Sequence, residues 1–451
     1  MLKLFAVISV FAASSVALQA QEPRWPTSVC AELKADLTEG PLGHLPASAE
    51  SRLDTARIQI ALKNCGAGKA VKLVKGSGNA FLSGHLQLPT GVTLWIDAGV
   101  TLFASRNPRD FDRTPHSCGI IDSNGGGCLP LIYAANTRNS GIVGLGTIDG
   151  RGGQTMIGSS GTWWQLAARA GTNTRQNNPK LAVVYNSQDF TLYKVRLHNS
   201  PEFHFATRNV DGLTVWGVTV DTPSKAYSSA THARNTDAFD PNGRNMVFSD
   251  LYVNTGDDHI AIKGISPVAN VLVQNSHFYK GHGMSIGSET YGGVVNVTVR
   301  NLSIDGADIG LRIKSDCSKG GTVSGVRYEN ICIRKTPKPL VFNAYYSTRQ
   351  GNKYPNFHDI HVTNTHIVGS EHKPQIIFKG YNKNYPLKIN LDNVVSDVKE
   401  TVTASNAEIT LGPGQVVNIP VVANSGSNVH VSGHGGKSNT VDCSHMFVPL
   451  P

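Results

Sequence analysis

The sequence predicts a single-stranded right-handed parallel β-helix, an all-β fold, with a short helix capping its N-terminal end. Three observations support this prediction: a short apolar pattern that repeats along the chain, a high glycine content, and few long stretches of helical periodicity. The chain has 451 residues, of which 46 are glycine. This composition is typical of an extended β protein with many turns.

The repeat consists of alternating apolar residues, a two-residue polar or glycine step, and alternating apolar residues again. Period-2 alternation predicts strands, and the step between the two halves predicts a corner in the chain. The instances begin at Phe190, Leu213, Met246, Val271, Val297, Val326 and Ile360.

A unit of about 25 residues built from short strands cannot bury its own apolar face, but stacked units form a continuous core. This spacing favours a parallel β-helix over a β-propeller, whose blades have roughly 40 to 50 residues. Segments 92–96 and 142–148 have the same character and are expected to form earlier turns of the stack. No linker divides residues 21–451, which are predicted to be one domain with a cap region over about residues 21–80.

The N-terminal end of such a stack needs a cover, because unpaired strand edges promote aggregation. Residues 51–65 are predicted to contain a short amphipathic helix that closes this end. The side chains expected on its apolar side are Leu53, Ala56, Ile60 and Leu62.

Residues 1–20 are predicted to be a signal peptide, because Lys3 precedes an apolar run over residues 4–13 and small residues follow. Cleavage after Ala17 or after Ala20 fits this pattern. The run is too short to span a bilayer, and no later segment reaches 18 apolar residues. We therefore expect a secreted, extracellular protein that is soluble and has no membrane partner.

Seven cysteines suit an oxidising compartment. Two pairs bracket short segments and are predicted to be disulfides, namely Cys30 with Cys65 and Cys118 with Cys128. Cys317, Cys332 and Cys443 form an odd remainder that the sequence does not pair. Because Cys332 lies in a strand-like segment, we expect it to be a buried free thiol.

The formal net charge of +9 falls to +8 without Lys3, and an exported protein with this charge suits an anionic partner. Basic runs interleaved with aromatic residues are missing from the sequence, so nucleic acid is not expected as a partner. The charge alone does not identify which anionic partner binds.

Charged residues recur in phase with the repeat. Asp257 follows Met246 at the same interval at which His282 follows Val271. We therefore expect Asp257 and His282 to be neighbours in successive turns, about 4.8 Å apart at the backbone. Asp237 lies in the long insertion before Met246, so its path is less defined by the repeat.

Four motifs occur in a fixed order: Asn235-Thr236-Asp237, Gly256-Asp257-Asp258, Gly281-His282-Gly283 and Arg312-Ile313-Lys314. Together they resemble the polygalacturonases, the pectin-hydrolysing glycoside hydrolases, and look closest to bacterial secreted endopolygalacturonases. The resemblance extends from Cys30 to about Ile367 and implies a right-handed parallel β-helix. Ala238 and His259 depart from the family pattern, and segment 224–232 looks longer than in close relatives.

Inverting hydrolysis needs one protonated carboxyl to donate to the glycosidic oxygen and one ionised carboxyl to activate water. Mutual repulsion among three aspartates should raise one of their pKa values. The resemblance implies that Asp257 is the general acid and that Asp237 and Asp258 hold and activate the water. His282 is expected to support the acid through a hydrogen bond.

Arg312 and Lys314 alternate along a predicted strand, so their side chains share one face. Arginine binds a carboxylate through two hydrogen bonds and lysine adds a point charge, so both are expected to bind the galacturonate carboxylate beside the cleaved bond. By local alignment Tyr346 matches the substrate-site tyrosine of the family, although Tyr345 is adjacent. The resemblance also implies that Asn235 binds substrate.

The expected partner is polygalacturonate or pectin, acted on by a monomer without a metal or another cofactor. Ordinary loop lengths favour endo action over exopolygalacturonase activity, and a rhamnogalacturonan hydrolase on the same fold stays open. A calcium-dependent pectate lyase would instead need acidic calcium ligands and an arginine base. A non-catalytic β-helix adhesin would give no reason for three aspartates to occur with Arg312 and Lys314.

Overall fold

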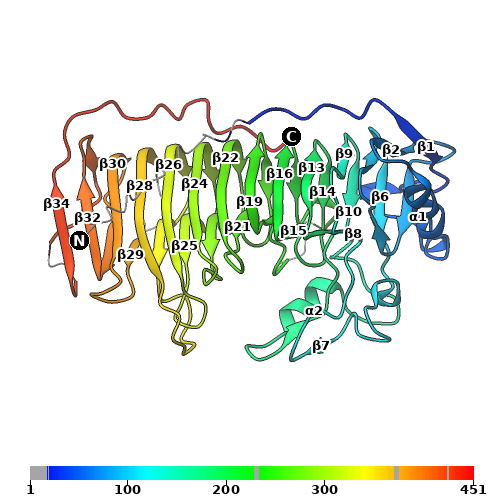
Figure 1. Cartoon of the computed structure of the whole chain (residues 1–451), viewed down its shortest axis with the longest axis horizontal. Helices are drawn as coiled ribbons and strands as arrows, with labels where there is room; N and C mark the ends of the chain where they lie inside the picture. The colour runs from blue at the N-terminus through cyan, green and yellow to red at the C-terminus, as the bar shows by residue number, and fades with distance from the viewer. Residues whose placement is uncertain (1–17, 19, 228–232, 370–374, 424–425) are drawn as a thin grey trace, which may run out of the picture.

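The computed structural model describes residues 18, 20–227, 233–369, 375–423 and 426–451. It is a right-handed parallel β-helix whose strands stack along one long axis (Figure 1). Most of the predicted signal peptide, and residues 228–232 of the long insertion, lie outside the described residues. In the part of the chain that the structure describes, no helix has the length and apolar character needed to cross a membrane.

Two parallel sheets and one small antiparallel pair contain all the strands of the described residues. The larger sheet has 21 strands: β1 (Val29–Lys34), β2 (Lys69–Val74), β3 (Ala80–Ser83), β5 (Val92–Ile96), β6 (Thr101–Ala104), β9 (Gly141–Gly144), β10 (Thr147–Asp149), β13 (Gln188–Tyr193), β14 (Arg196–His198), β16 (Val210–Trp216), β17 (Thr219–Asp221), β19 (Gly243–Ser249), β20 (Tyr252–Asn254), β22 (Val268–Phe278), β24 (Val294–Asp305), β26 (Thr322–Arg334), β28 (Asn356–Val368), β30 (Leu387–Ser396), β32 (Ala407–Leu411), β33 (Val416–Val417) and β34 (Val429–Gly433).

The smaller parallel sheet has 11 strands: β4 (Leu86–Gln87), β8 (Ile132–Ala135), β12 (Ala182–Tyr185), β15 (Phe205–Arg208), β18 (Phe239–Asp240), β21 (Ile260–Ile262), β23 (Met284–Gly287), β25 (Ile309–Lys314), β27 (Lys338–Asn343), β29 (Gln375–Lys379) and β31 (Thr401–Ser405). The antiparallel pair is β7 (Ile121–Asp122) with β11 (Arg175–Gln176). The helices are α1 (Thr55–Asn64) and α2 (Trp163–Arg169), with short 3-10 turns η1 (Pro41–Gly43), η2 (Ala47–Ala49), η3 (Pro108–Phe111) and η4 (Lys225–Tyr227).

The strand register confirms the repeat read from the sequence. The seven predicted starting residues form six consecutive pairs, from Phe190 with Leu213 to Val326 with Ile360. The predicted corners are also present, because the second residue of each step has a left-handed backbone, as at Gly217 (φ 64°) and Asn301 (φ 53°). Glycine and asparagine adopt this conformation more easily than other residues.

The core follows from the alternation, because every second side chain of a strand points into the stack. One column of paired residues crosses ten strands, and all of its members are fully buried. Its members are Leu94, Ile142, Leu192, Val215, Phe248, Val273, Val299, Tyr328, Val362 and Leu391. Burial of this apolar area, at about 25 cal/mol per Å², holds the turns together.

The capping helix is confirmed, but its predicted apolar side is wrong except at Leu62. Helix α1 buries Ile58 and Leu62, whereas Leu53 is 40% and Ile60 is 60% exposed. Ala56 is exposed as well. Residues four apart share one face of a helix, so the packing of Ile58 with Leu62 turns Ile60 toward solvent.

The predicted disulfides Cys30–Cys65 and Cys118–Cys128 are both present. The expectation of a free thiol at Cys332 is wrong, because Cys332 pairs with Cys443 across 111 residues of sequence, with Cα atoms 5.8 Å apart. The cause is the C-terminal segment, which leaves β34 and returns along the stack (Figure 1). Cys317 is the free cysteine.

Candidate active site

A cleft of about 1250 Å³ lies over the outer face of the smaller sheet. One wall is the segment after α2, residues 171–176, and the other includes residues 346–349. These loops project from the same side of the stack (Figure 1). All eight residues predicted for catalysis or substrate binding line this cleft: Asp237, Asp257, Asp258, His282, Arg312, Lys314, Tyr346 and Asn235.

The strand register brings the aspartates together. Phe239 pairs with Ile260, and Ile260 pairs with Met284, so the residues just before β18, β21 and β23 lie at the same end of three neighbouring strands. Asp237, the aspartate pair Asp257 and Asp258, and His282 are these residues. The position of Asp237, which the repeat left undefined, is thus set by pairing in the smaller sheet.

The predicted contact between Asp257 and His282 is present. However, the prediction that these two residues occupy equivalent positions in successive turns is wrong by one residue. In the larger sheet Met246 pairs with Val271, whereas in the smaller sheet Ile260 pairs with Met284, so the step between these turns is one residue shorter in the smaller sheet. Asp258 is therefore level with His282, and the Asp257 side chain reaches it from one residue away.

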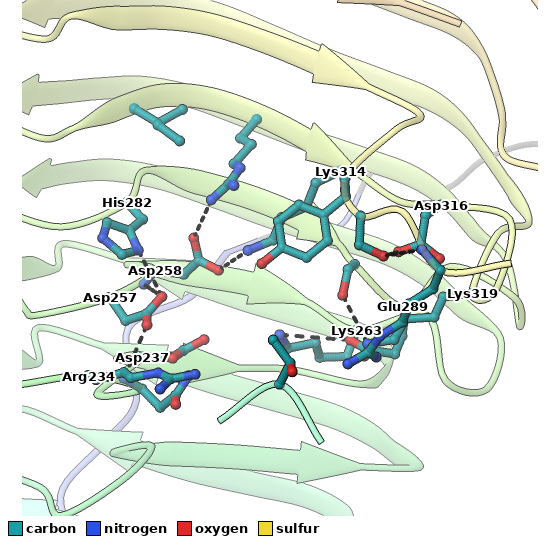
Figure 2. A pocket seen from close by; sticks show the side chains of 18 of the residues that line it. Arg234, Asp237, Asp257, Asp258, Lys263, His282, Glu289, Lys314, Asp316 and Lys319 are labelled. Carbon is teal, nitrogen blue, oxygen red and sulfur yellow. Dashed lines mark hydrogen bonds and ion pairs between the residues drawn. The ribbon is translucent and has the colours of Figure 1, made fainter. Parts of the chain in front are cut away.

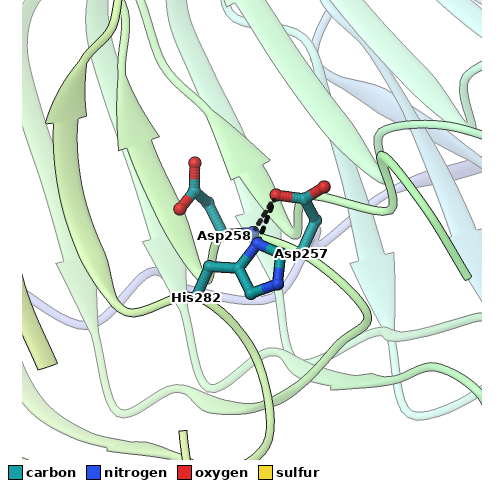
Figure 3. Close-up of side chains that lie close together, drawn as sticks. All are labelled: Asp257, Asp258 and His282. Atoms are coloured by element: carbon teal, nitrogen blue, oxygen red, sulfur yellow. Dashed lines mark hydrogen bonds and ion pairs between the residues drawn. The ribbon is translucent and has the colours of Figure 1, made fainter. Parts of the chain in front are cut away.

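Asp257 is fixed by hydrogen bonds on both carboxylate oxygens. Its Oδ1 is 2.9 Å from His282 Nδ1 (Figure 3) and accepts the backbone N–H of Asp258. Its Oδ2 accepts the backbone N–H of Asn235. The hydrogen bond to Asp257 raises the pKa of His282 above its ordinary value. His282 Nε2 lies 3.5 Å from Asp308, and 36% of the His282 side chain is exposed to solvent.

Asp258 is surrounded by donors and cations. Its Oδ2 is 2.5 Å from Lys314 Nζ, and its Oδ1 accepts a 2.8 Å hydrogen bond from Ser285 and lies 3.5 Å from Arg312 Nη1. Burial by itself would raise the pKa of Asp258, but Lys314, Arg312 and Lys263 outweigh it and lower the pKa to about 2. Asp258 is therefore ionised throughout the mildly acidic range.

Asp237 has the opposite environment. It is only 3% exposed, and its Oδ1 has no hydrogen-bond partner among the described residues. Burial, and then the negative charges of Asp240, Asp257 and Asp258, raise its pKa well above the ordinary value. The cleft therefore combines a carboxyl group with a lowered pKa, Asp258, and one with a raised pKa, Asp237.

Arg312 and Lys314 lie on β25, separated by the buried Ile313, and both face Tyr346. The Tyr346 ring centre is 5.5 Å from Arg312 Cζ and 5.2 Å from Lys314 Nζ. Tyr345 turns away and stacks on Tyr381 at 5.7 Å. Of the two adjacent tyrosines, only Tyr346 lines the cleft among the described residues.

Asn235 has a left-handed backbone (φ 58°), and its side-chain oxygen accepts a 3.1 Å hydrogen bond from Gln176 of β11. His259, one of the departures from the family pattern, is fully buried and stacks on Phe278 at 4.7 Å. Its ring nitrogens contact the Tyr279 carbonyl and the Gly283 N–H. His259 therefore packs beneath the site and does not enter the cleft.

A second group of charges in the cleft was not found from the sequence. Lys263 Nζ lies 3.5 Å from Asp240 and 4.0 Å from Glu289, and Glu289 also forms an ion pair with Lys319 (Figure 2). Burial would raise the pKa of Glu289, but Lys263 and Lys319 lower it to about 2. The sequence did contain a signal for Lys263. In Ile260-Ala-Ile-Lys263, the alternation along the strand places Lys263 in the same column of the smaller sheet as Lys314.

Asp257, Asp258 and His282 offer ligand atoms within 4.8 Å of one another, a spacing that a metal ion could bridge. The same atoms are already bonded to protein groups, because Asp257 contacts His282 and Asp258 contacts Lys314. The absence of a metal from the reaction stays a prediction of the sequence.

A cleft across a parallel β-helix, lined by carboxyl groups with oppositely shifted pKa values beside fixed cations, is typical of a glycoside hydrolase that acts on an acidic sugar. The chain belongs to the glycosyl hydrolases family 28, whose family model matches residues 65–415. It is 43% identical to a polygalacturonase of Ralstonia solanacearum, over 95% of this chain and 92% of that protein.

It is also 43% identical to an endo-polygalacturonase of Pectobacterium carotovorum subsp. carotovorum, over 86% of this chain and 92% of that protein. Among solved structures, the polygalacturonase from Erwinia carotovora ssp. carotovora superposes with a TM-score of 0.78 at 42% identity. That match covers 87% of this chain and 98% of the other. The chain is therefore a glycoside hydrolase with the architecture of the polygalacturonases.

Proposed function

We propose that this protein is an endopolygalacturonase that hydrolyses the α-1,4-galacturonosidic bonds of de-esterified homogalacturonan. The observation that carries this proposal is the arrangement of three aspartates in the cleft beside Arg312 and Lys314. Carboxyl groups supply acid and base catalysis, and the two cations supply recognition of an acidic sugar. Relatives that are named endo-polygalacturonase and polygalacturonase align over most of their lengths.

Asp257 acts as the general acid in this proposal. It gives its proton to the glycosidic oxygen as the bond to the anomeric carbon breaks, and its backbone-anchored carboxyl group holds the position of that proton. His282 bonds to Asp257 on one side and is partly exposed on the other. It can therefore pass a proton from solvent to Asp257 before the next cycle.

Asp258 and Asp237 hold the attacking water. Asp258 is ionised and accepts the proton that the water loses, while Asp237 keeps its proton and orients the water through a hydrogen bond. The anomeric carbon gains the hydroxyl group and the leaving sugar gains the proton of Asp257. The two protons balance, and the enzyme returns to its starting state through solvent.

We further propose that the anomeric configuration is inverted. Oxygens of Asp257 and Asp258 lie within 4.8 Å, and carboxyl groups about 5 Å apart are usual in retaining enzymes, against about 6.5–9.5 Å in inverting ones. However, both oxygens of Asp258 are engaged by Lys314 and Ser285, which disfavours a covalent bond to the sugar. Proton NMR of the first product decides the question, because a β-anomer indicates inversion and an α-anomer indicates retention.

Arg312 binds the carboxylate of the galacturonate unit beside the cleaved bond. Its guanidinium group lies in the cleft, 3.5 Å from Asp258 and beside the Tyr346 ring, so it offers a positive charge to the sugar carboxylate. Lys314 shares its charge between Asp258 and that carboxylate, and the exposed Tyr346 ring offers a stacking face for the sugar. Asn235 positions Asp257 through its backbone and contacts substrate through its side chain.

A time course of the purified protein on polygalacturonate tests the function. Mixed oligomers early in the reaction are expected for endo action, whereas monomer or dimer alone would indicate an exo enzyme. Products that absorb ultraviolet light, together with inhibition by a chelator, would indicate a calcium-dependent lyase and not a hydrolase. Cleavage of a rhamnogalacturonan but not of polygalacturonate would show that the substrate is rhamnogalacturonan. Binding without any release of reducing sugar would indicate an adhesin.

Three further proposals concern the whole chain. Residues 1–20 act as a signal peptide, residues 21–451 form one catalytic domain, and the mature enzyme is an extracellular monomer. The apolar run after Lys3 supports the first of these. N-terminal sequencing of the exported protein and its mass in solution test them.

A further inference from the structure

His259 lies in a buried column of the smaller sheet, just inside the row of catalytic side chains. Each member of the column comes one residue before a member of the paired series that runs through β15, β18, β21 and β23, and the members are His204, Ala238, His259 and Gly283. All four are buried. Both departures from the family pattern, Ala238 and His259, therefore fall in this column. Because side chains alternate along a strand, His259 points into the stack, whereas Asp258 points into the cleft.

The His259 ring forms two hydrogen bonds that fix its protonation. Its Nε2 is 3.0 Å from the backbone oxygen of Tyr279, and its Nδ1 accepts the backbone N–H of Gly283 at 3.1 Å. A carbonyl only accepts and an N–H only donates, so the proton is on Nε2 and Nδ1 has none. Burial lowers the pKa of His259 to about 4, which agrees with this neutral form.

The two partners of His259 are the ends of the turn that carries His282. Tyr279 and Gly283 bracket this turn, and the middle of the turn lies against the ring. A Cβ added to Gly281 would come within 2.6 Å of His259 Cε1. The backbone N–H of His259 also donates to the Gly283 oxygen at 3.2 Å. His259 thus supports the whole turn from within the stack.

The His282 side chain depends on this support for its alignment. Its ring contacts Asp257 at 2.9 Å and Asp308 at 3.5 Å, and 36% of the side chain is exposed (Figure 3). Asp308 is 76% exposed and confines the ring little. The position of the ring relative to Asp257 therefore follows from the position of the turn. His259 is not among the residues that line the cleft, so it acts on the site only through its neighbours.

We propose that His259 is a positioning residue, which holds the turn of His282 so that the imidazole stays within hydrogen-bond distance of Asp257. A bond from each ring nitrogen fixes one end of the turn. Without these bonds the turn can move, and the contact between His282 and the proposed general acid is weakened. This inference rests on the proposed function, in which His282 returns a proton to Asp257.

Three substitutions separate the two bonds of His259. His259→Gln keeps a donor near the position of Nε2 for the Tyr279 oxygen, His259→Asn keeps an acceptor near the position of Nδ1 for the Gly283 N–H, and His259→Leu keeps neither. Misplacing a catalytic group by about 1 Å can cost about 10²-fold, so kcat of His259→Leu should fall by about tenfold to 10²-fold. His259→Gln and His259→Asn should each lose less. KM should stay within about twofold, because the lost interaction does not involve bound substrate.

The pKa of His282 provides a readout that does not require turnover. The hydrogen bond to Asp257 raises this pKa, and the charged groups that face the ring are Asp257, Asp258 and Asp308. The His259 substitutions leave all three in place, so a weaker bond to Asp257 should lower the pKa of His282 toward its ordinary value. NMR titration of the histidine ring signals measures this, and the signal missing in His282→Gln identifies His282. An unchanged pKa of His282 in all three variants would overturn the proposal.

His366→Gln is the matched control. The His366 ring also bridges two groups, the backbone oxygen of Val441 and the carboxylate of Asp397, but it lies on β28 of the larger sheet. Activity and the pKa of His282 should be unaffected in this variant. Equal losses of turnover in His366→Gln and His259→Gln would show a general effect on folding and contradict the positioning role. If His259→Leu does not fold, the amide variants still provide the comparison.

A double variant tests whether His259 acts through His282. His282→Gln removes the ring that His259 positions, so adding His259→Gln to it should cause no further loss of kcat. A further loss as large as in the wild-type background would show that His259 acts on another part of the site. If the wild type cleaves no galacturonate substrate, the proposed function fails, and the pKa of His282 still decides the positioning role.

Discussion

Two stacks of polar side chains run along this β-helix, and they differ in what stacking does to them. On the larger sheet, Asn275, Asn301, Asn330, Asn364 and Asn393 occupy the corner position of successive turns. Each amide donates to the oxygen of the one before it, at 2.8–3.2 Å. On the smaller sheet the stacked groups are carboxyls, Asp237 beside Asp257 and Asp258, which only accept hydrogen bonds when ionised.

An amide both donates and accepts, so a ladder of identical amides satisfies itself. A stack of carboxylates repels itself and needs cations or protons to persist. Here Lys314 and Arg312 stabilise the charge of Asp258, while burial and the neighbouring carboxylates raise the pKa of Asp237. The same repeat thus produces a hydrogen-bonded ladder on one sheet and the candidate catalytic site on the other, according to the chemistry of the stacked group.

The largest effect is expected from turning a catalytic carboxyl into an amide. Asp257→Asn keeps the shape and removes the proton donor, so kcat should fall by about 10²-fold to 10⁴-fold or more with KM little changed. Reducing-sugar assays on polygalacturonate measure this. Asp250→Asn is the control, because Asp250 occupies a left-handed corner of the larger sheet (φ 57°), where asparagine is common, and activity should be unaffected. Near-normal turnover in Asp257→Asn would refute its role as the acid.

Removing Lys314 or Arg312 in turn should distinguish the roles of these two cations. Lys314→Ala leaves the buried Asp258 without its nearest cation, so the pKa of Asp258 rises and the acid limb of the pH–rate profile moves to higher pH. Both kcat and KM should worsen by about tenfold or more. Arg312→Ala should act chiefly on KM, because Arg312 lies farther from Asp258, at 3.5 Å. Identical pH profiles for both variants and the wild type would show that these cations serve substrate alone.

A smaller effect, on the stability of the fold, is expected from removing the negative charge of Glu289. Its pKa is about 2 in the folded protein and ordinarily 4.5, so it stabilises the fold above about pH 4.5, and this contribution is lost as the pH falls toward about 2. Glu289→Gln should therefore lower the unfolding free energy by on the order of 2 kcal/mol at pH 6. The difference from the wild type should shrink in acid. Denaturant unfolding at several pH values measures this, and a constant difference would contradict it.

The smallest effect is expected in the amide ladder. Asn330→Ala should cost about 1–2 kcal/mol, because alanine is strained in the left-handed conformation and the ladder bonds are lost. Asn330→Gly keeps the backbone conformation (φ 57°) and removes only the amide, so it should cost less. Activity should be unchanged in both. A loss of turnover without a loss of stability would show that the two stacks are coupled.

The repeat predicted most of the fold because strands of the larger sheet alternate without interruption. All six pairings between the seven predicted turns are present, from Phe190 to Ile360. The prediction was less accurate where a second sheet has its own register. The one-residue shift between Asp257 and His282 arises in the turns that join the two sheets, which no periodicity within one sheet reveals.

Other misses share a cause, which is contact between residues distant in sequence. Cys332 pairs with Cys443 because the C-terminal segment returns along the stack. Lys263 and Glu289 become part of the cleft because three turns stack beside one another. Tyr346 is not one of these misses, because local alignment had already favoured it; its ring faces Arg312, whereas Tyr345 stacks on Tyr381.

The sequence by itself determined the strand-and-corner repeat, the kind of fold and the identity of the candidate catalytic residues. These features depend on local alternation, on which residues tolerate a left-handed corner, and on motif order, all of which are written along one chain. Only the tertiary structure decided which carboxyl group has a lowered pKa and which has a raised one. Protonation depends on burial and on the distance to cations several turns away, and those quantities exist only once the turns are stacked.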